Sequence, residues 1–343
     1  MGNRMTNEIP SATCDTRLRG STVQQPLPSG FGPQTTAGEV LAGRNLRGTM
    51  VLVTGGHAGL GLETTRALSN AGATVHIGAR DPQKAQLAVE KMKNVQVGRL
   101  DLSDPGSIDR FATDFLQANR ALDLLINNAG IMAAPLMRDG RGYEMQFSTN
   151  HLGHFQLTAK LWEALKKSRR ARVVSLSSRG HMMGKVDLQD PNFSERPYDK
   201  WKAYGQAKSA NSLFAVELDR RGQAHGIRAF AAHPGGILTD LIRHMSAEEL
   251  KTFGIYQENG VMKVPERFKT VAQGAATTIW CAVSPQLDGL GGAYCEDCDI
   301  AAVVPADSKL YNGVRPWAID KATAAALWTL SEKLTQTPTD FVT

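Results

Sequence analysis

The sequence Met50-Val51-Leu52-Val53-Thr54-Gly55-Gly56-His57-Ala58-Gly59-Leu60-Gly61 decides the fold of this 343-residue chain. Its first four residues are apolar, as expected of a strand that is buried on both faces. The glycines that follow have the spacing Gly-x-x-x-Gly-x-Gly and precede a helical pattern. Glycine lets a backbone approach a pyrophosphate without a Cβ clash, and a helix N-terminus supplies free N–H groups. The stretch predicts a dinucleotide-binding turn, with an ordinary strand-to-helix turn as the alternative.

Strand-like and helical segments alternate along the rest of the chain. The expected strands are 74–78, 95–100, 122–126, 172–176 and 227–232, and the expected helices are 62–70, 83–93, 107–118, 154–167 and 204–221. Regular alternation is typical of βαβ units and therefore of a parallel sheet covered by helices on both faces. We predict an α/β fold of three layers, with a doubly wound parallel sheet (Rossmann fold) in a single domain.

The two ends of the chain differ from this middle. Residues 1–33 are polar, contain several Gly and Pro and lack periodicity, so we expect a disordered extension. Residues 34–310 should form the nucleotide-binding catalytic domain, starting with a short helix opened by the capping box Thr36-Ala-Gly-Glu39. In the tail, 311–343, apolar residues recur at Ala324, Leu327, Trp328, Leu330 and Leu334. They predict a helix that packs on the core or on another subunit.

Composition bears on the cellular location and on the classes of binding partner. The hydrophobic content is 42%, which suits a soluble globule, and the sequence contains no run of eighteen apolar residues and no hydrophobic region of a signal peptide. We expect a cytoplasmic protein that binds no membrane. The net charge is +6, but its one tight basic run, 166–172, lies where a helix should end, so we predict no nucleic-acid partner.

Cysteine usage points away from a metal. Cys14, Cys281, Cys295 and Cys298 include a single Cys-x-x-Cys pair, without a second pair or a His-x-x-x-His motif. Because a structural zinc site needs four ligands, we predict reduced thiols and no metal.

The end of the second strand bears on which dinucleotide is bound. A free ribose 2′-hydroxyl is usually held by an acidic residue there, whereas a 2′-phosphate needs a cation. The chain has Gly78-Ala79-Arg80-Asp81, with Ala79 at the acidic position and Arg80 after it. This favours NADP(H) over NAD(H), with Asp81 either paired to Arg80 or capping the next helix. Asp101-Leu102 is placed for the adenine amino group, and Asn127-Asn128-Ala129-Gly130 is a polar turn equally suited to structure and to ligand contact.

Tyr204-Gly-Gln-Ala-Lys208 carries the chemistry. Residues four apart share one helical face, so the phenol and the ammonium can meet over one substrate. An ammonium beside a phenol favours the phenolate and so is expected to lower the pKa of Tyr204. The pair is suited to moving a proton on or off an oxygen.

With these residues assembled, the chain resembles the short-chain dehydrogenase/reductase family over about residues 48–300. The matching motifs are the glycine loop, the 127–130 turn, Asn150, Ser178, Tyr204 with Lys208, and His233-Pro234-Gly235 leading to Thr239. Within the family, 150–155, 177–181 and 208–214 are most similar to the branch of retinol dehydrogenases and WW-domain oxidoreductases and its bacterial relatives. The resemblance implies about seven strands and a homodimer or homotetramer.

The resemblance also implies roles for individual residues. Tyr204 would be the general acid or base, Lys208 would lower its pKa and bind the nicotinamide ribose, Ser178 would hold the substrate oxygen, and Asn150 would position a water linked to Lys208. Ser178 is chosen over Ser177 because the family's catalytic serine is generally the second of such a pair. The neighbouring His151, His154, His181 and His233 are expected to be packed or capped. The implied cofactor-binding set is Gly55, His57, Gly59, Leu60, Gly61, Arg80, Asp101, Leu102, Asn128, Ala129, Gly130, Tyr204, Lys208, Pro234, Gly235, Ile237 and Thr239.

Two departures from the family concern the substrate. The gap from Ser178 to Tyr204 is about twice the usual one, so we expect an inserted substrate loop near 179–203. The segment 241–270, which follows the loop expected to hold the nicotinamide, is predicted to be a second substrate loop. The first contains Met182, Met183, Phe193, Tyr198 and Trp201, which favour a bulky apolar substrate or pack the loop down. Membrane-bound retinol dehydrogenases have an N-terminal hydrophobic anchor, whereas this chain has a polar extension, so a retinoid substrate is not implied.

We therefore expect an NADP(H)-dependent oxidoreductase that interconverts a carbonyl and an alcohol of a fairly apolar small molecule. One alternative is a C=C double-bond reductase of the same family, which uses the same Tyr and Lys. Another is a nucleotide-binding sensor without catalysis, which has no chemical need for all four of Tyr204, Lys208, Ser178 and Asn150.

Overall fold

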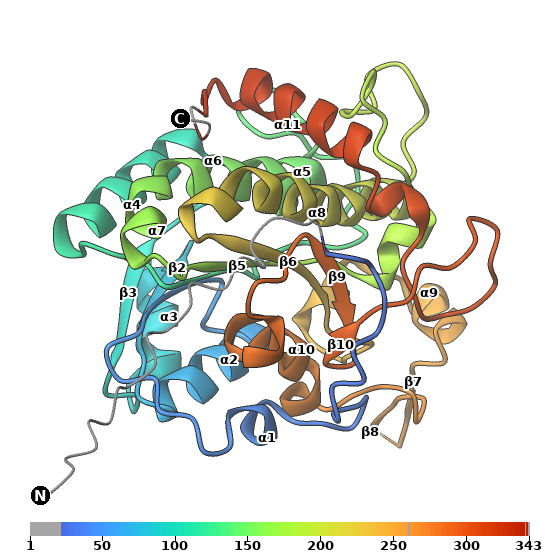
Figure 1. Ribbon diagram of the computed structural model, residues 1–343. Helices are drawn as coiled ribbons and strands as arrows, with labels where there is room; N and C mark the ends of the chain where they lie inside the picture. The colour runs from blue at the N-terminus through green and yellow to red at the C-terminus, as the bar shows by residue number, and fades with distance from the viewer. Residues whose placement is uncertain (1–21, 260, 340, 342–343) are drawn as a thin grey trace, which may run out of the picture.

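The computed structural model describes residues 22–259, 261–339 and 341, which form a three-layer α/β fold around one sheet (Figure 1). Within this part of the chain the sheet has eight strands in the order β10-β9-β6-β5-β4-β1-β2-β3. All pair in parallel except the short β10, which runs antiparallel to β9. The strands are β1 Met50–Thr54, β2 Thr74–Ala79, β3 Val95–Arg99, β4 Leu124–Asn127, β5 Arg172–Leu176, β6 Arg228–His233, β9 Ala293–Glu296 and β10 Asp299–Ile300. The strand order reverses direction between β1 and β4, so the predicted doubly wound sheet is confirmed.

Helices cover both faces of the sheet (Figure 1). One face packs against α4 Pro105–Ala118, α6 Gly153–Lys160, α7 Trp162–Ser168 and α8 Lys200–Gly222, and the other against α1 Ala37–Leu41, α2 Gly59–Asn70, α3 Pro82–Val89 and α10 Val271–Val283. Leu52 packs in the core on the α8 side, whereas Val51 and Val53 pack on the α2 side. Because successive side chains of a strand point to opposite faces, a strand buried on both faces must be apolar throughout.

Most predicted elements lie within a few residues of the observed ones, with two differences. The helix expected over 154–167 is divided into α6 and α7, because Leu161 leaves the helical conformation at ψ 4°. The strand β9 was not expected from the sequence, since its four residues Ala-Tyr-Cys-Glu contain no β-branched run. The capping box of α1 is confirmed, with the side chains of Thr36 and Glu39 each bonded to the other's backbone.

The N-terminal extension differs from the expectation. Residues 22–33 lie along the β9 edge, where Gln24 Nε2 donates to the carbonyls of Tyr294 and Ala301, each at 2.7 Å. The N–H of Leu27 donates to Asp299 Oδ1 at 2.8 Å. The prediction of disorder is therefore wrong for residues 22–33, because their polar groups pair with the sheet edge, while residues 1–21 lie outside the described part.

The C-terminal helix α11 Lys321–Thr335 packs on α8 (Figure 1). Trp328 stacks on Phe214 with a 5.7 Å centroid distance and an interplanar angle of 5°, and it contacts Phe155 edge-on at 4.9 Å. Of the two predicted placements, the structure therefore has the helix on the core of the same chain.

The basic run takes part in the fold. Lys166 and Lys167 occupy the last turn of α7, and Arg172 opens β5, where it is buried and pairs with Asp288 at 2.7 Å. Among the described residues, no helix combines the length and apolar character needed to cross a membrane.

Candidate active site

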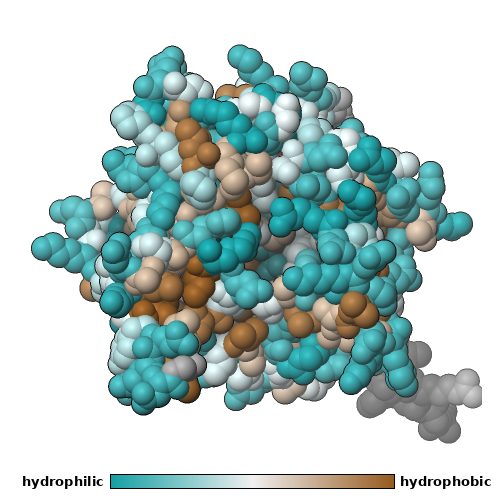
Figure 2. All heavy atoms as spheres, turned by 180° about the vertical axis from the view of Figure 1, so that it is seen from behind, coloured by the Kyte–Doolittle hydropathy of each residue, from teal (hydrophilic) through white to brown (hydrophobic). Residues whose placement is uncertain are grey.

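A cavity of about 1450 Å³ opens where the parallel strands end. Its wall includes the loops after β1, β2, β3, β4, β5 and β6. This volume exceeds the roughly 300–1,000 Å³ typical of a small-molecule site, so it has room for a dinucleotide and a second molecule. Figure 2 shows the face opposite the view of Figure 1, with hydrophobic side chains gathered beside a recess.

The glycine loop forms one end of this cavity. Gly55 and Gly59 have φ of +64° and +50°, which favour glycine. A Cβ on Gly61 would lie 2.3 Å from the carbonyl oxygen of Gly55, so the loop closes only around a bare glycine. His57 Nδ1 is buried without a hydrogen-bond partner in the described residues. A glycine cradle at the start of α2 with a free ring nitrogen fits the pyrophosphate of a dinucleotide.

The ends of β2 and β3 contribute Arg80, Asp101 and Leu102 to the cavity wall. Asp81 caps α3 by accepting a 3.0 Å hydrogen bond from the N–H of Lys84, which is one of its two expected roles. Asp101 accepts from the N–H and the hydroxyl of Ser103, at 2.9 and 2.6 Å. Arg80 is exposed beside the nucleotide end of the cavity.

The 127–130 turn is hydrogen-bonded to the end of β1 and also lines the cavity. Thr54 Oγ1 accepts from the N–H groups of Asn128 and Ala129, at 2.9 and 3.0 Å, and Asn128 Nδ2 donates to the Thr54 carbonyl at 2.8 Å. These bonds join the end of β4 to the glycine loop. Asn128, Ala129 and Gly130 also face the cavity.

The loop after β6 closes the cavity from the other side. Pro234, Gly235, Ile237 and Thr239 all line it. The side chain of Thr239 lies opposite Gly59, where an added Cβ would be 3.5 Å from it. The structure thus brings the whole predicted cofactor-binding set to one cavity.

Ser178 and Tyr204 meet beside this nucleotide end. Ser178 follows β5, accepts from the N–H of Gly180 at 3.0 Å and lies close enough to Tyr204 to lower the pKa of its phenol. Ser177 instead donates to the carbonyl of Lys208 at 2.8 Å and is buried against α8. The choice of Ser178 over Ser177 therefore agrees with the placement of the two hydroxyls.

Tyr204 and Lys208 lie one turn apart on α8 and both line the cavity. Lys208 Nζ lies 5.6 Å from the centre of the Tyr204 ring and donates to the Leu176 carbonyl at 2.9 Å. Burial raises the pKa of Tyr204 to about 12 against the opposing effect of the Ser178 hydrogen bond, and it lowers the pKa of Lys208 to about 8. The pKa of Tyr204 is therefore raised and not lowered as expected, because burial of the phenolate dominates and the group that opposes it is Ser178, not Lys208.

Lys208 makes stability depend on pH. The pKa of Lys208 falls from 10.5 to about 8 on folding, so between these pH values the unfolded chain binds more protons and stability rises with pH. Relative to a Lys208→Met variant, the native protein should gain about 3 kcal/mol of unfolding free energy from pH 8 to pH 10.5, measured by urea denaturation. Parallel curves for the two proteins would contradict this burial effect.

Asn150 lies in a π-helical turn, η1 Ser148–Leu152, just before α6. Its side chain accepts from the N–H of Ile131 and donates to the Ile131 carbonyl, both at 2.9 Å. Asn150 therefore ties this turn to the loop after β4, beside Gly130 and Lys208. Its water-positioning role stays a prediction.

His154, which was expected to be packed or capped, supports this turn through contacts that the sequence did not indicate. His154 lies 2.9 Å from the Asn150 carbonyl through Nδ1 and 2.8 Å from Thr54 Oγ1 through Nε2. Burial lowers the pKa of His154 to about 4, so the ring is neutral. The neutral ring connects the first strand to Asn150, and no sequence pattern links positions one hundred residues apart.

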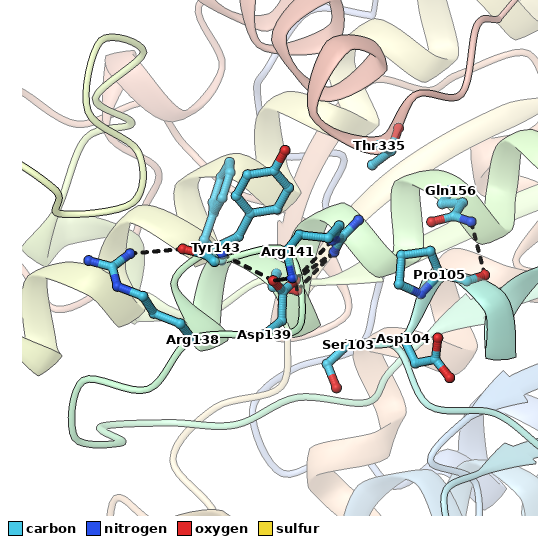
Figure 3. Close-up of polar contacts among 12 residues, drawn as sticks. Ser103, Asp104, Pro105, Arg138, Asp139, Arg141, Tyr143, Gln156 and Thr335 are labelled. Carbon is cyan, nitrogen blue, oxygen red and sulfur yellow. Dashed lines mark hydrogen bonds and ion pairs between the residues drawn. The ribbon is translucent and has the colours of Figure 1, made fainter.

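A second network fixes the start of the same turn (Figure 3). Asp139 accepts from Ser148 Oγ at 2.6 Å, from Arg141 Nη2 at 2.7 Å and from the N–H of Tyr143 at 3.0 Å. Arg138 donates to the carbonyls of Gly142 and Asn192, at 3.0 and 3.1 Å. The loop 138–143 thus holds both η1 and the insertion after β5, a role the sequence did not indicate.

Of the other three histidines expected to be packed or capped, two are buried in the core and one lines the cavity. His151 and His181 are buried with hydrogen-bond partners, as predicted for packed residues, and burial lowers the pKa of His181 to about 4. His233 lines the cavity, and its Nδ1 accepts from the N–H of Arg179 at 3.2 Å.

The side chains of the insertion after β5 divide between packing and lining the cavity. Phe193 is buried, and Tyr198 donates to the Ala134 carbonyl at 2.9 Å, so these two hold the loop down. Met182, Met183 and Trp201 line the cavity.

The segment after β6 forms a second wall. It contains the 3-10 helix Asp240–His244, α9 Ala247–Thr252 and the hairpin β7 Tyr256–Glu258 with β8 Val261–Lys263. Glu249 of α9 accepts from Lys200 Nζ at 2.7 Å and from Trp201 Nε1 at 2.9 Å. These bonds attach the segment to the start of α8, next to the insertion.

No metal site is found among the described residues, where Cys281, Cys295 and Cys298 are free and buried and no three potential ligands group together. Cys14 lies outside this part of the chain.

The cavity brings a glycine loop suited to a dinucleotide together with a serine, a tyrosine and a lysine that can hydrogen-bond to a carbonyl oxygen. This combination is typical of nicotinamide-dependent oxidoreductases.

A family model described as short chain dehydrogenase matches residues 49–250. A probable oxidoreductase of Streptomyces lividans is 44% identical over 83% of this chain and 96% of its own length. Human retinol dehydrogenase 12 is 38% identical over 84% of this chain and 87% of its own length.

Solved structures agree with this assignment. An uncharacterized protein from Mycobacterium paratuberculosis has a TM-score of 0.68 and 35% identity, covering 89% of this chain and 98% of that one. RhlG of Pseudomonas aeruginosa in complex with NADP is 22% identical with a TM-score of 0.57, over 74% of this chain and 95% of that one, and shares the fold. The chain belongs to the short-chain dehydrogenase/reductase family, in the branch of the retinol dehydrogenases.

Proposed function

We propose that this oxidoreductase is NADP(H)-dependent and interconverts a carbonyl with a primary or secondary alcohol on a fairly apolar small molecule. The observation that carries the proposal is that Ser178, Tyr204 and Lys208 lie together in the wall of the cavity that the glycine loop also lines. The nicotinamide nucleotide, when bound, supplies or accepts the hydride.

The chain's own groups supply the rest of the reaction. In reduction, Tyr204 donates its proton to the substrate oxygen, and the high pKa of its buried phenol keeps that proton available through the neutral range. Ser178 donates to the same oxygen as negative charge develops there. Lys208 would hold the ribose, and Asn150 fixes the turn behind it.

Two observations support the finer parts of the proposal. Arg80 lies at the nucleotide end of the cavity while Asp81 is occupied as a helix cap, which favours a 2′-phosphate over a free hydroxyl. Met182, Met183 and Trp201 make the substrate wall apolar.

Arg80 provides a test of cofactor choice. In Arg80→Ala, the Kd for NADPH should rise roughly 10- to 100-fold, because a charge-assisted contact is lost, while the Kd for NADH stays the same. The control is Arg99→Ala, which removes an exposed arginine of β3 outside the cavity. An equal loss for both nucleotides would contradict a 2′-phosphate contact.

The activity itself is tested with purified protein, NADPH or NADH, and aromatic and aliphatic ketones and aldehydes, following the absorbance of the reduced nucleotide. We expect turnover of apolar carbonyls with NADPH preferred. Nucleotide binding without turnover of any carbonyl would contradict the proposal.

A further inference from the structure

Arg179 stands directly after Ser178 and lines the same cavity. Its guanidinium makes no hydrogen bond or ion pair with any described residue, and its Nε is buried without a partner. The centroid of the Tyr311 ring lies 5.3 Å from the guanidinium carbon. An arginine has five N–H donors, and a buried N–H group without an acceptor costs free energy.

The other cations near this part of the cavity are engaged. Arg243 donates to the Asp240 carbonyl at 3.1 Å, Arg267 donates to the Phe253 carbonyl at 2.9 Å, and Lys269 pairs with Asp297. Arg179 therefore differs from its neighbours in having its donors free.

The carboxylate that acts on Arg179 from β9 does not bind it. Glu296 accepts from the N–H of Gly313 at 2.6 Å, and its charge reaches Arg179 electrostatically but at no ion-pair distance. The guanidinium thus lies in a favourable electrostatic field and has no ion-pair partner among the described residues.

Apolar side chains share the cavity with Arg179: Met182, Met183, Trp201, Phe253 and Phe268 also line it. A contact between charged groups is stronger where the surroundings exclude water. One free arginine fits a monoanion, because its planar fork pairs with both oxygens of a carboxylate.

We propose that Arg179 binds a carboxylate on the substrate, so that the preferred substrate is an apolar ketone or aldehyde that carries a carboxylate group. The proposal rests on the proposed function, since it names the substrate class of that same site. Tyr311 is 74% exposed, and its ring lies beside the guanidinium that would bind the carboxylate.

Binding tests this without relying on turnover. The protein is loaded with NADPH and titrated in a calorimeter with 4-phenylbutanoate and with its methyl ester, which has the same body and no charge. We expect the acid to bind roughly 10- to 100-fold more tightly than the ester. Arg179→Gln should abolish that preference, Arg179→Lys should retain part of it, and Arg120→Gln, an exposed arginine outside the cavity, should leave it unchanged.

Kinetics give a second readout with 4-oxo-4-phenylbutanoate and its methyl ester. The ratio of their kcat/KM values should fall roughly 10- to 100-fold in Arg179→Gln, mainly through the KM of the acid. Equal binding of acid and ester to the native protein, or a preference that persists in Arg179→Gln, would overturn the proposal. An unchanged rate in a Tyr204→Phe variant would overturn the proposed function and leave the binding preference standing.

Discussion

Replacing Tyr204 with phenylalanine is expected to lower kcat for carbonyl reduction by about 100- to 10,000-fold, because the proton donor to the substrate oxygen is removed. The phenyl ring should keep its place, since the native ring is 4% exposed and held against Gly180, where an added Cβ would lie 2.6 Å from Tyr204 Cε1. The measurement is kcat with a saturating apolar ketone, together with the Kd for NADPH, which should change little.

Tyr256→Phe is the matched control for this variant. Tyr256 lies in the β7–β8 hairpin, 49% exposed, and does not line the cavity. Its kcat should equal that of the native protein. Turnover by Tyr204→Phe at the native rate would show that another group donates the proton.

Changing Gly61 to alanine is expected to raise the Kd for the nucleotide by at least about 100-fold. The added Cβ would lie 2.3 Å from the Gly55 carbonyl oxygen and 2.5 Å from Asn128 Nδ2, so the loop that approaches the pyrophosphate must shift. A misplaced loop loses several hydrogen bonds to phosphate at once, each worth about 1.5–3 kcal/mol. Overpacking of this kind also lowers the free energy of unfolding by about 1–3 kcal/mol, which urea denaturation measures.

Gly38→Ala separates this clash from a general effect of removing glycine. Gly38 lies in α1, and an added Cβ would meet nothing closer than Thr36 Oγ1 at 4.0 Å. Alanine there should stabilise the protein by about 0.5–1 kcal/mol and leave nucleotide binding unchanged. Native affinity in Gly61→Ala would contradict the placement of the nucleotide on this loop.

Local patterns were enough to predict the framework of the site. The glycine loop depends on one strand–helix junction, and Tyr204 and Lys208 depend on the spacing of one helix, so their placement could be predicted from short stretches. The choice of Ser178 over Ser177 depended on the family resemblance and not on a strand pattern, since both residues follow the end of β5 at Leu176.

Contacts between distant segments could not be predicted in this way. The bonds from His154 to Thr54 and from Asn150 to Ile131 join separate loops, and the Asp139 network gathers polar groups that would be ordinary turn residues in isolation. Gln24 looked disordered for the same reason, since its partners are main-chain groups of the β9–β10 edge.

Burial explains why the electrostatics were also misjudged. The sequence places an ammonium near the Tyr204 phenol, but it does not say that both groups leave water on folding. Desolvation opposes the charged form of each, so the pKa of Tyr204 rises to about 12 while that of Lys208 falls to about 8.

In the proposed reaction, a hydride passes between the nicotinamide and a carbonyl carbon bound in this cavity. The most direct measurement uses NADPH that carries deuterium at both C4 positions of the nicotinamide and follows the label into the product of an apolar ketone, read by mass spectrometry and NMR. We expect one deuterium on the carbinol carbon for each NADPH consumed. Deuterium on a carbon of a former C=C bond in an enone, with the carbonyl intact, or a product without label, would contradict it.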